Sequence, residues 1–325
     1  MFNILLVGAG QLGSRHLQAL ALADFADISM QVVDPFAASL ERARERWEQV
    51  EHSPSIRSID FLTDIGQVQG EIDFCVVATN ADCRLQLLED MLARLTVKNL
   101  LLEKVLFQSE AQLEAAAQLF ARVGCKVWVN CPRRMFQGYS VLRERLCGQR
   151  SLALRVTGEQ WGLACNAIHF IDIWAFLCGA DSYAPDLSSV DREIVDSKRP
   201  GYKEINGTLG GFWNESLFSL TCLASSTHAP LRVEIETEDY RVTLNEGAGQ
   251  CELLGKASGA LESLPFQVLY QSRLTQHVAE SVFRGTPCQL TSFEESAALH
   301  APLLRALLGF FNEHDGGNYT LCPIT

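Results

Sequence analysis

The first 130 residues alternate between short apolar runs and longer segments in which apolar residues recur at helical spacing. Continuous apolar runs bounded by turn residues predict buried strands, and the segments between them predict amphipathic helices. The predicted strands are 3–7, 29–33, 74–78, 100–103 and 127–130, and the predicted helices are 13–23, 35–47, 81–94 and 109–123. This alternation predicts an α/β, Rossmann-type parallel sheet that is covered on both faces.

The pattern changes after this point. Residues 151–160, 217–225, 231–244 and 250–255 alternate between apolar and polar positions, most clearly in RVEIETEDYRVTL, and predict antiparallel strands with one wetter face. Helices are predicted at 166–178, 271–284 and 293–313. Residues 180–215, rich in Gly, Pro, Ser and charge, predict a long loop with one strand that covers a site. We therefore predict a Rossmann domain at 1–128 and an α+β domain at 129–325.

Composition excludes several classes of function. A chain of 325 residues with 47% hydrophobic residues and a net charge of -12 fits a globular protein and disfavours binding to nucleic acid or to an anionic membrane. No apolar stretch reaches the ~18 residues of a membrane span, and the start, MFNILLVGAG, has no basic region before its short apolar run. The eleven cysteines include no CxxC pair, which favours free thiols in a reducing cytoplasm over disulfides or structural zinc.

The segment VGAGQLGSRH at 7–16 follows an apolar strand and opens a helix. Gly8 allows the tight turn, Gly10 lets the backbone approach a pyrophosphate, and Gly13 lets the helix pack on the strand. The helix N-terminus favours the negative phosphates. We expect these glycines, with Gln11 and Leu12 between them, to contact a dinucleotide. The alternative is a glycine turn that binds no nucleotide.

The next strand ends at Asp34, the position expected for an acid that binds the adenosine ribose. Its carboxylate would accept hydrogen bonds from the ribose hydroxyls and repel a 2′-phosphate. Pro35 and Phe36 supply no cation there. The sequence therefore favours NAD over NADP.

Four segments together resemble the glucose–fructose oxidoreductase, inositol dehydrogenase and MocA family: GAGQLGSRH, ATNADCR at 78–84, KNLLLEKVL at 98–106, and the helix that carries His169 and Asp172. The resemblance implies a second domain built on a large open sheet. It also implies a nicotinamide-dependent dehydrogenase or reductase that acts on a carbohydrate-like CH–OH group. Partner subunits cover the open sheet in this family, so the resemblance implies a homodimer or homotetramer.

Glu103 and Lys104 match the family's Glu-Lys-Pro motif, whereas Val105 replaces the proline. The resemblance places Lys104 beside the nicotinamide and the reacting carbinol as a catalytic residue, and Glu103 among the cofactor contacts. A lysine at the end of a buried strand loses hydration, which lowers its pKa and makes it a usable acid or base near neutral pH. The alternative is a surface lysine paired with Glu103.

ATNADCR departs from the family at two positions: Asn80 stands where proline is common, and Arg84 where histidine is common. Thr79 and Asn80 still follow a buried strand, at the edge of the sheet where ligands of α/β folds bind. We expect both to contact the cofactor. For Arg84, a surface position on the helix is an equal alternative.

Asn166, His169 and Asp172 are three residues apart in an apolar helix that ends near Gly179, so they form one polar stripe. The family often carries Asp-x-x-x-His-x-x-Asp here, and Cys165 occupies the first position. The resemblance makes His169 a second catalytic residue and makes Asn166 and Asp172 substrate contacts. A structural network is the alternative. A metal site is disfavoured because no further ligand cluster is present.

Weaker candidates surround the stripe. Trp161 offers a stacking surface for a sugar ring or belongs to the core. Arg134, next to Arg133 at the domain junction, could bind a substrate carboxylate or phosphate, or form an interdomain salt bridge. Further candidates from the 180–215 loop are Lys203, Glu204 and Asn206, whereas His16 has no partner in sequence and is assigned no role.

The sequence thus predicts an NAD-dependent oxidoreductase that transfers hydride between nicotinamide and a secondary alcohol or ketone of a sugar, cyclitol or sugar derivative. Lys104 and His169 would share the proton transfer. The alternative is an NAD-binding regulatory or sensor protein on the same fold, because a fold does not determine function.

Overall fold

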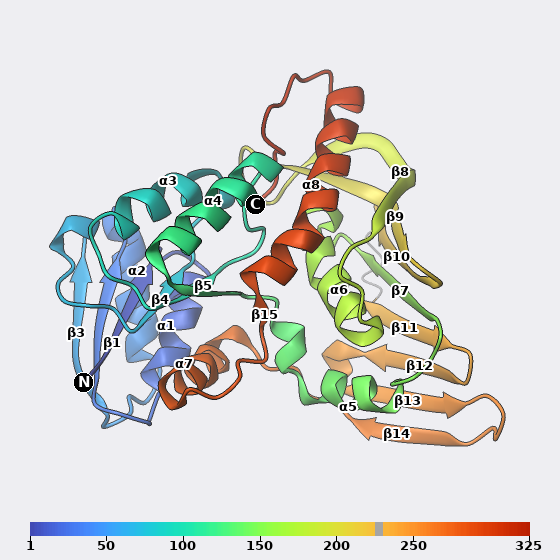
Figure 1. Ribbon diagram of the computed structural model, residues 1–325, viewed down its shortest axis with the longest axis horizontal. Helices are drawn as coiled ribbons and strands as arrows, with labels where there is room; N and C mark the ends of the chain where they lie inside the picture. The colour runs from blue at the N-terminus through green and yellow to red at the C-terminus, as the bar shows by residue number, and fades with distance from the viewer. Residues whose placement is uncertain (225–229) are drawn as a thin grey trace. The chain divides into compact units, whose positions relative to one another are not determined.

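The computed structural model describes residues 1–224 and 230–325 (Figure 1). The chain forms two compact units. The first unit comprises Met1–Phe107, Ala111–Asn130 and Leu269–Phe293, and the second comprises Gln108–Glu110, Cys131–Val268 and Glu294–Thr325. The main division between the units lies between Asn130 and Cys131. The segment Leu269–Phe293 belongs to the first unit because it packs on the first helix and adds an edge strand to the first sheet.

In the described residues the first unit holds a seven-stranded sheet of order β15-β6-β5-β4-β1-β2-β3, parallel except at β15. Its strands are β1 (Phe2–Val7), β2 (Ile28–Val33), β3 (Ile56–Leu62), β4 (Phe74–Val77), β5 (Asn99–Leu102), β6 (Lys126–Val129) and β15 (Thr291–Ser292). The strand order reverses between β1 and β4, the switch point at which open α/β sheets bind ligands. The predicted Rossmann-type parallel sheet is confirmed.

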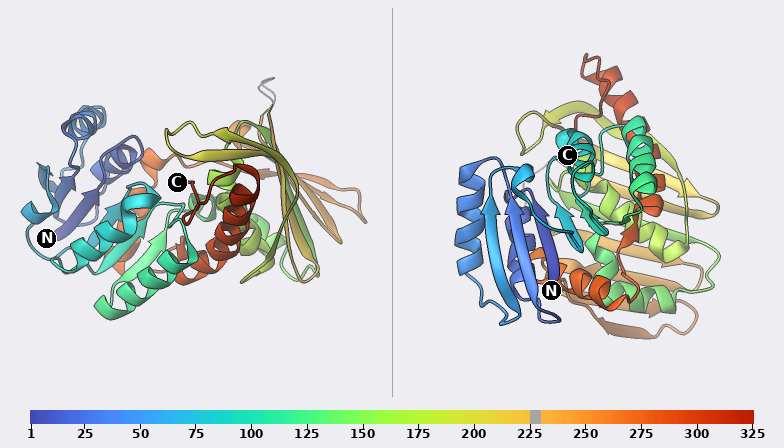
Figure 2. Two further views of the ribbon diagram at one scale, coloured as in Figure 1. Left: turned by 90° about the horizontal axis from the view of Figure 1, so that it is seen from above. Right: turned by 60° about the vertical axis from the view of Figure 1, so that its left-hand side comes forward.

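Helices cover both faces of this sheet: α1 and α2 lie on one side, and α3 and α4 on the other (Figures 1 and 2). Their bounds are α1 (Gly13–Ala21), α2 (Ala37–Glu48), α3 (Ala81–Leu92) and α4 (Glu110–Val123), and α7 (Thr275–Arg284) packs on α1. Each predicted strand and helix of this part is present within a few residues. The pattern missed β3, because its side chains are only partly buried and form no continuous apolar run.

The second unit contains, in its described residues, an eight-stranded sheet of order β14-β13-β12-β11-β7-β10-β9-β8, antiparallel except for the central β7–β10 pair. The strands are β7 (Leu152–Glu159), β8 (Ala184–Asp196), β9 (Lys203–Trp213), β10 (Ser216–Leu223), β11 (Arg232–Thr237), β12 (Tyr240–Asn245), β13 (Gln250–Gly255) and β14 (Leu261–Pro265). The prediction of a large, mainly antiparallel open sheet is confirmed.

Helices lie along one face of the second sheet, and no helix of the described residues lies on its other face (Figure 2). They are α5 (Gln137–Arg145), α6 (Leu163–Cys178) and α8 (Phe293–His314), and α6 packs on β7, β9 and β10. The opposite face exposes large apolar side chains, among them Phe212, Leu217 and Leu223. The sheet therefore has one covered and one open face.

The prediction of a long loop with one strand over 180–215 is wrong, because this segment forms the long antiparallel pair β8–β9. Most side chains of β8 are exposed or half-buried, so its polar composition resembles that of a loop. Similarly, the run 231–244 divides into β11 and β12, and the end of predicted strand 217–225 reaches position 225, outside the described residues. No helix in the described part of the chain is long and apolar enough to cross a membrane.

Candidate active site

The loop between β1 and α1 has the close backbone packing that its glycines predict. A Cβ atom at Gly13 would lie 1.8 Å from the carbonyl oxygen of Gly8, so a side chain there would push the helix off the strand. Gly8 has a φ of +91°, which favours glycine. A Cβ atom at Gly10 would meet nothing within 4 Å, so the backbone there borders open space. This cradle fits a pyrophosphate at the start of α1.

Asp34 lies directly after β2 and is 6% exposed. Its Oδ2 accepts a hydrogen bond from the backbone N–H of Ala9 at 2.7 Å, and its Oδ1 accepts one from that of Phe36 at 2.9 Å. Each oxygen keeps a second lone pair for a ribose hydroxyl. The carboxylate is therefore fixed against the phosphate loop, as a ribose-binding acid requires.

Gln11 is exposed and Leu12 half-buried at the tip of the loop. Arg46 on α2 fixes this tip: its guanidinium donates to the Gln11 carbonyl and side-chain oxygens, both at 2.5 Å, and to Ser14 Oγ at 2.6 Å. Burial and the neighbouring charges of Arg15 and Arg42 lower the pKa of Arg46. A residue far from the glycine motif thus positions the loop.

Thr79 and Asn80 follow β4, across the switch point from the phosphate loop. Thr79 is half-buried, and Asn80 is exposed at the N-terminus of α3. The surface interpretation of Arg84 is wrong, because its side chain is 1% exposed and donates to the backbone carbonyls of 79, 103, 105 and 106.

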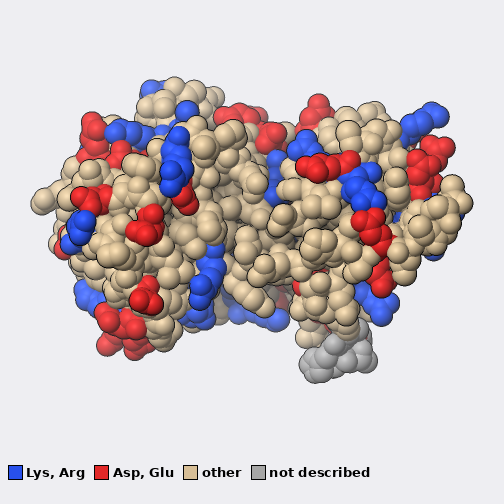
Figure 3. Space-filling model, turned by 90° about the horizontal axis from the view of Figure 1, so that it is seen from below, with Lys and Arg blue, Asp and Glu red and all other residues tan. Residues whose placement is uncertain are grey.

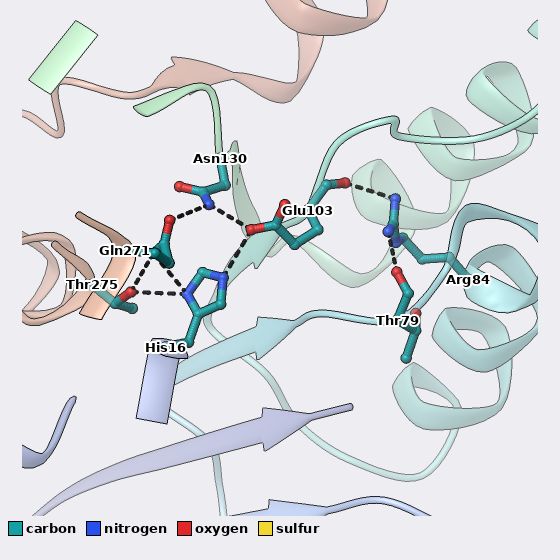
Figure 4. Close-up of polar contacts among 7 residues, drawn as sticks. All are labelled: His16, Thr79, Arg84, Glu103, Asn130, Gln271 and Thr275. Atoms are coloured by element: carbon teal, nitrogen blue, oxygen red, sulfur yellow. Dashed lines mark hydrogen bonds and ion pairs between the residues drawn. The ribbon is translucent and has the colours of Figure 1, made fainter. Parts of the chain in front are cut away.

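Glu103 is the centre of a buried network at the end of β5 (Figure 4). Its Oε1 lies 2.8 Å from His16 Nε2 and accepts a hydrogen bond from Asn130 Nδ2. Asn130 also donates to Gln271 Oε1 at 2.8 Å, and this fixes the Gln271 amide with its nitrogen toward His16 Nδ1, 3.1 Å away. His16 Nε2 thus faces the Glu103 carboxylate, and His16 Nδ1 faces Gln271 and Thr275. The carboxylate of Glu103, expected to contact the cofactor, is therefore enclosed by protein side chains.

This network changes the ionisation of Glu103. Burial opposes the charge, but the hydrogen bond and charge of His16, the hydrogen bond from Asn130 and the nearby charge of Lys104 outweigh it and hold the pKa of Glu103 below its ordinary value. His16 was not assigned a role from the sequence. The available signal was its position three residues after Gly13, on the buried face of α1.

Lys104 is half-buried between Glu103 and the fully buried Val105. The peptide bond between Lys104 and Val105 is cis. Glu103 faces His16 and Asn130 inside the unit, and the charge of Lys104 also acts on its carboxylate. The first unit thus brings the predicted cofactor residues and Lys104 to the carboxyl ends of β1, β2, β4 and β5.

The polar stripe of the second unit lies on α6. Asn166 and His169 are half-buried, whereas Asp172 is fully buried. Arg134 forms an ion pair with Asp172, in which Nε donates a hydrogen bond to Oδ2 at 2.9 Å and Nη2 lies 2.8 Å from Oδ1. Arg134 and Asp172, both expected to contact substrate, therefore contact each other. Asn166 Nδ2 donates to the carbonyl oxygen of Trp161 at 2.7 Å.

The start of α6 is capped by Glu204 from β9. Gly162, the N-cap residue, has a φ of +78° and no side chain to cap the helix. Glu204 instead accepts from the backbone N–H groups of Ala164 at 2.8 Å and Cys165 at 3.2 Å. Burial raises the pKa of Glu204, and these hydrogen bonds offset part of that rise. From the sequence, Glu204 was a weak substrate-site candidate in a predicted loop. In the structure it lies on β9 and contacts the start of α6.

Trp161 and Arg133 also belong to the second unit, close in sequence to residues already described. Trp161 is half-buried, donates from Nε1 to the Thr221 carbonyl at 2.9 Å and contacts Phe170 edge-to-face. Arg133 forms a bidentate pair with Glu246, with both N–O distances 2.8 Å. The arginines at 133 and 134 therefore form ion pairs within the second unit, which contradicts the interdomain salt-bridge alternative.

Among the described residues, no group of three or more His, Cys, Asp or Glu side chains could hold a metal ion. All eleven cysteines lie in the described part of the chain and are free thiols. Acidic and basic side chains are interspersed on the visible face of each unit (Figure 3). This face therefore shows no continuous basic surface of the kind that binds nucleic acid.

Comparison with known proteins identifies the first unit. Residues 2–131 match an oxidoreductase family, GFO_IDH_MocA, described as having an NAD-binding Rossmann fold. This part of the chain therefore matches the NAD-binding domain of that family, in agreement with the resemblance seen in the sequence motifs. None of the curated proteins matches the sequence.

Solved structures share the fold of this protein over nearly all of the chain. An oxidoreductase from Agrobacterium radiobacter in complex with NAD+, L-tartaric acid and magnesium matches with a TM-score of 0.71, 15% identity and coverage of 93% of this chain and 94% of that one. UDP-N-acetylglucosamine 3-dehydrogenase from Acidithiobacillus ferrooxidans matches with a TM-score of 0.67 and 14% identity, and the match covers 95% of this chain and 96% of that one. A Gfo/Idh/MocA family oxidoreductase from Vibrio cholerae matches with a TM-score of 0.69 and 16% identity, and the match covers 98% of this chain and 100% of that one.

Proposed function

We propose that this protein transfers hydride between NAD and a secondary alcohol or ketone of a sugar, cyclitol or sugar derivative. The observation that carries the proposal is the position of Lys104, half-buried at the carboxyl end of β5 and preceded by a glutamate that a buried network holds ionised. Ligands of this sheet class bind at these strand ends. Such a lysine is a suitable proton acceptor for a reacting hydroxyl.

The cofactor residues support NAD in preference to NADP. The bound cofactor would supply the hydride acceptor, and Gly8, Gly10 and Gly13 would hold its pyrophosphate. Asp34 would hold the adenosine ribose, because its fixed carboxylate offers two free lone pairs. The same negative charge disfavours a 2′-phosphate, and Phe36, 70% exposed beside it, brings no compensating cation. Thr79 and Asn80 would contact the cofactor from the end of β4.

The proton steps rest on two side chains. Lys104 Nζ would accept the proton of the substrate hydroxyl as its carbon loses hydride, and His169 would assist as the titrating group of the stripe. Asn166 would donate or accept hydrogen bonds without titrating. The ion pair between Arg134 and Asp172 would fix the position of α6, which carries His169. Trp161 would offer an apolar edge to a sugar ring. Ketone reduction uses the same groups in reverse.

A second function is an NAD-binding sensor, favoured by one observation, the replacement of the family's first stripe aspartate by Cys165. Turnover of a panel with NAD+ discriminates the two, and myo-inositol, glucose and UDP-N-acetylglucosamine are the first substrates to assay by nicotinamide absorbance. The last is included because it is the substrate in the name of a structural neighbour. Turnover of any member supports the enzyme. Tight NADH binding without turnover across a broad polyol and ketose panel supports the sensor.

The role of His169 has its own test, which separates catalysis from folding. We expect His169→Ala to fold and to bind NADH like the wild type but to turn over roughly 100-fold more slowly. Cys178→Ala at the far end of the same helix is the matched control and keeps wild-type activity. Loss of soluble protein, with normal specific activity in the remainder, would give His169 a structural role only.

We also propose that a second copy of the chain covers the open sheet face, giving a homodimer or homotetramer. The exposed Phe212, Leu217 and Leu223 on that face support this, since isolated monomers seldom leave several large apolar side chains exposed on one sheet. Light scattering tests the proposal, and a monomer at micromolar concentration contradicts it.

A further inference from the structure

Arg84 is a buried guanidinium whose described hydrogen-bond acceptors are backbone carbonyls. Its Nη1 donates to the carbonyl oxygens of Glu103 at 2.7 Å, Val105 at 2.5 Å and Leu106 at 2.7 Å, and its Nη2 donates to that of Thr79. Figure 4 shows the guanidinium between the Glu103 and Thr79 carbonyls. The charge therefore lies among oriented peptide dipoles, which stabilise it away from water.

These contacts fix the backbone on both sides of Lys104. The segment from 103 to 106 follows the end of β5, where the Glu103 N–H donates to the Val77 carbonyl, and the carbonyls of this segment require donors. Three of them converge on one guanidinium. From the other side, the Glu103 carboxylate is held by His16 and Asn130. Lys104 is thus the half-buried residue of a turn that is anchored from two directions.

Arg84 also joins this turn to the phosphate loop. Its fourth acceptor, the carbonyl of Thr79, belongs to the turn after β4. That turn packs on Gly8 so closely that a Cβ atom on the glycine would lie 3.0 Å from Ala78. One side chain therefore connects the lysine turn with the backbone beside the pyrophosphate cradle, and all of these residues belong to the first unit.

Two departures from the family pattern meet at this point. Arg84 stands where histidine is common and Val105 where proline is common, and the side chain of the first donates to the carbonyl of the second. A proline ring restricts the backbone through its fixed φ, whereas Arg84 restricts the same segment by fixing the directions of its carbonyls. The two devices act on one short turn, so one can replace the other.

We propose that Arg84 is the positioning residue for Lys104 and supplies the backbone constraint that the missing proline at 105 would give. The inference deepens the proposed function, on which it rests. Arg84 acts through the turn and does not touch the reacting atoms. Substitutions at 84 should therefore alter how Lys104 is presented and lower kcat, while KM changes little.

The test uses Arg84→Met, Val105→Pro and the double variant in the full chain. Peptide mass spectrometry measures the rate at which trinitrobenzenesulfonate modifies Lys104 across a pH series, with the exposed Lys126 as internal reference. We expect Arg84→Met to bring the labelling rate of the half-buried Lys104 close to that of Lys126. With a substrate from the panel, kcat should fall roughly 100-fold, the scale of a small misplacement of a catalytic group.

The double variant separates positioning from general destabilisation. Introducing Val105→Pro into the Arg84→Met variant should recover at least about tenfold of the lost kcat and return the Lys104 labelling toward wild type, because coupled sites give non-additive effects. Val105→Pro alone should stay near wild type. A purely structural role for Arg84 would lower thermal stability without this recovery.

Arg84→Lys covers the case in which the methionine variant does not fold. The ammonium keeps the charge but reaches fewer carbonyls, so Lys104 labelling should fall between wild type and Lys126. Wild-type labelling in a folded Arg84→Lys or Arg84→Met protein, or additive losses in the double variant, overturns the proposal. Labelling does not need turnover, so a wild-type protein without activity contradicts the proposed function and leaves this test valid.

Discussion

Two buried glutamates, one in each unit, contact the segments that carry the two candidate catalytic residues but are held in opposite ways. Glu103, 3% exposed, precedes Lys104 and accepts hydrogen bonds from the side chains of His16 and Asn130. Glu204, 8% exposed, accepts backbone N–H groups at the start of the helix that carries His169. Side-chain partners and a nearby lysine lower the pKa of the first, whereas burial raises that of the second.

The difference follows from what each carboxylate supports. The lysine turn lies beyond the end of β5, and the side chains of His16, Asn130 and Arg84 hold it. Residues of α6 are already placed by the helix, and Glu204 only satisfies N–H groups that the helix leaves over. The turn that carries Lys104 is thus held by a network of side chains, whereas the helix that carries His169 needs only a cap at its start. Changes at the two glutamates should differ accordingly.

The largest stability effect is expected at Glu103. Glu103→Ala leaves His16 and Asn130 without their common acceptor inside the unit, and breaking a buried pair in this way costs about 3–5 kcal/mol. Urea unfolding of the variant measures the loss. Glu114→Ala, at an exposed position on α4, is the matched control and should change stability by less than about 0.5 kcal/mol. Equal losses in the two variants would show that the network does not stabilise the fold.

The sequence predicted the two parts of the site unequally. Gly8, Gly10, Gly13 and Asp34 were recognisable because their backbone geometry depends on residue type and short spacing. The positions of Lys104 and His169 came from the resemblance and from helical periodicity.

The supports could not be predicted, because they join residues far apart in the chain. His16 contacts Glu103, 87 positions away, and Glu204 contacts Ala164, 40 positions away. Arg84 had the residue type of a surface position, and only the structure shows the carbonyls that surround it. The β8–β9 pair was mistaken for a loop because a largely exposed strand carries little apolar pattern.

A smaller effect is expected at Glu204. Glu204→Ala removes the acceptor of two backbone N–H groups, a change equivalent to the loss of a helix cap and worth about 1 kcal/mol. Amide hydrogen exchange should become faster at Ala164 and Cys165, and little changed in the middle of α6. Glu193→Ala, at an exposed position of the adjacent strand β8, is the control. Unchanged exchange at the helix start would contradict the cap.

The smallest effect is a pH dependence of opposite sign at the two sites. The pKa of Glu103 is lowered from 4.5, so the unfolded chain binds more protons, and its contribution is present above that value and lost as pH falls through the folded pKa. The pKa of Glu204 is raised from 4.5, so its contribution is present below that value and lost as pH rises through the folded pKa.

Glutamine variants reveal these contributions, because an amide does not titrate. As pH rises toward 4.5, the stability difference between wild type and Glu103→Gln should grow. As pH rises above 4.5, the stability difference between wild type and Glu204→Gln should shrink. Urea unfolding at each pH gives both curves. If the two stability differences changed with pH in the same direction, the proposed contrast between the Glu103 network and the Glu204 cap would be contradicted.

The central claim, that Lys104 transfers the substrate proton in an NAD-dependent oxidoreductase, is tested most directly by kcat/KM of Lys104→Met, measured against pH with Lys126→Met as control. We predict a loss of roughly 100- to 10,000-fold, loss of the pH dependence that Lys104 contributes, and an NADH dissociation constant within about threefold of wild type. A Lys104→Met enzyme with kcat/KM within about threefold of wild type across the pH range contradicts the account.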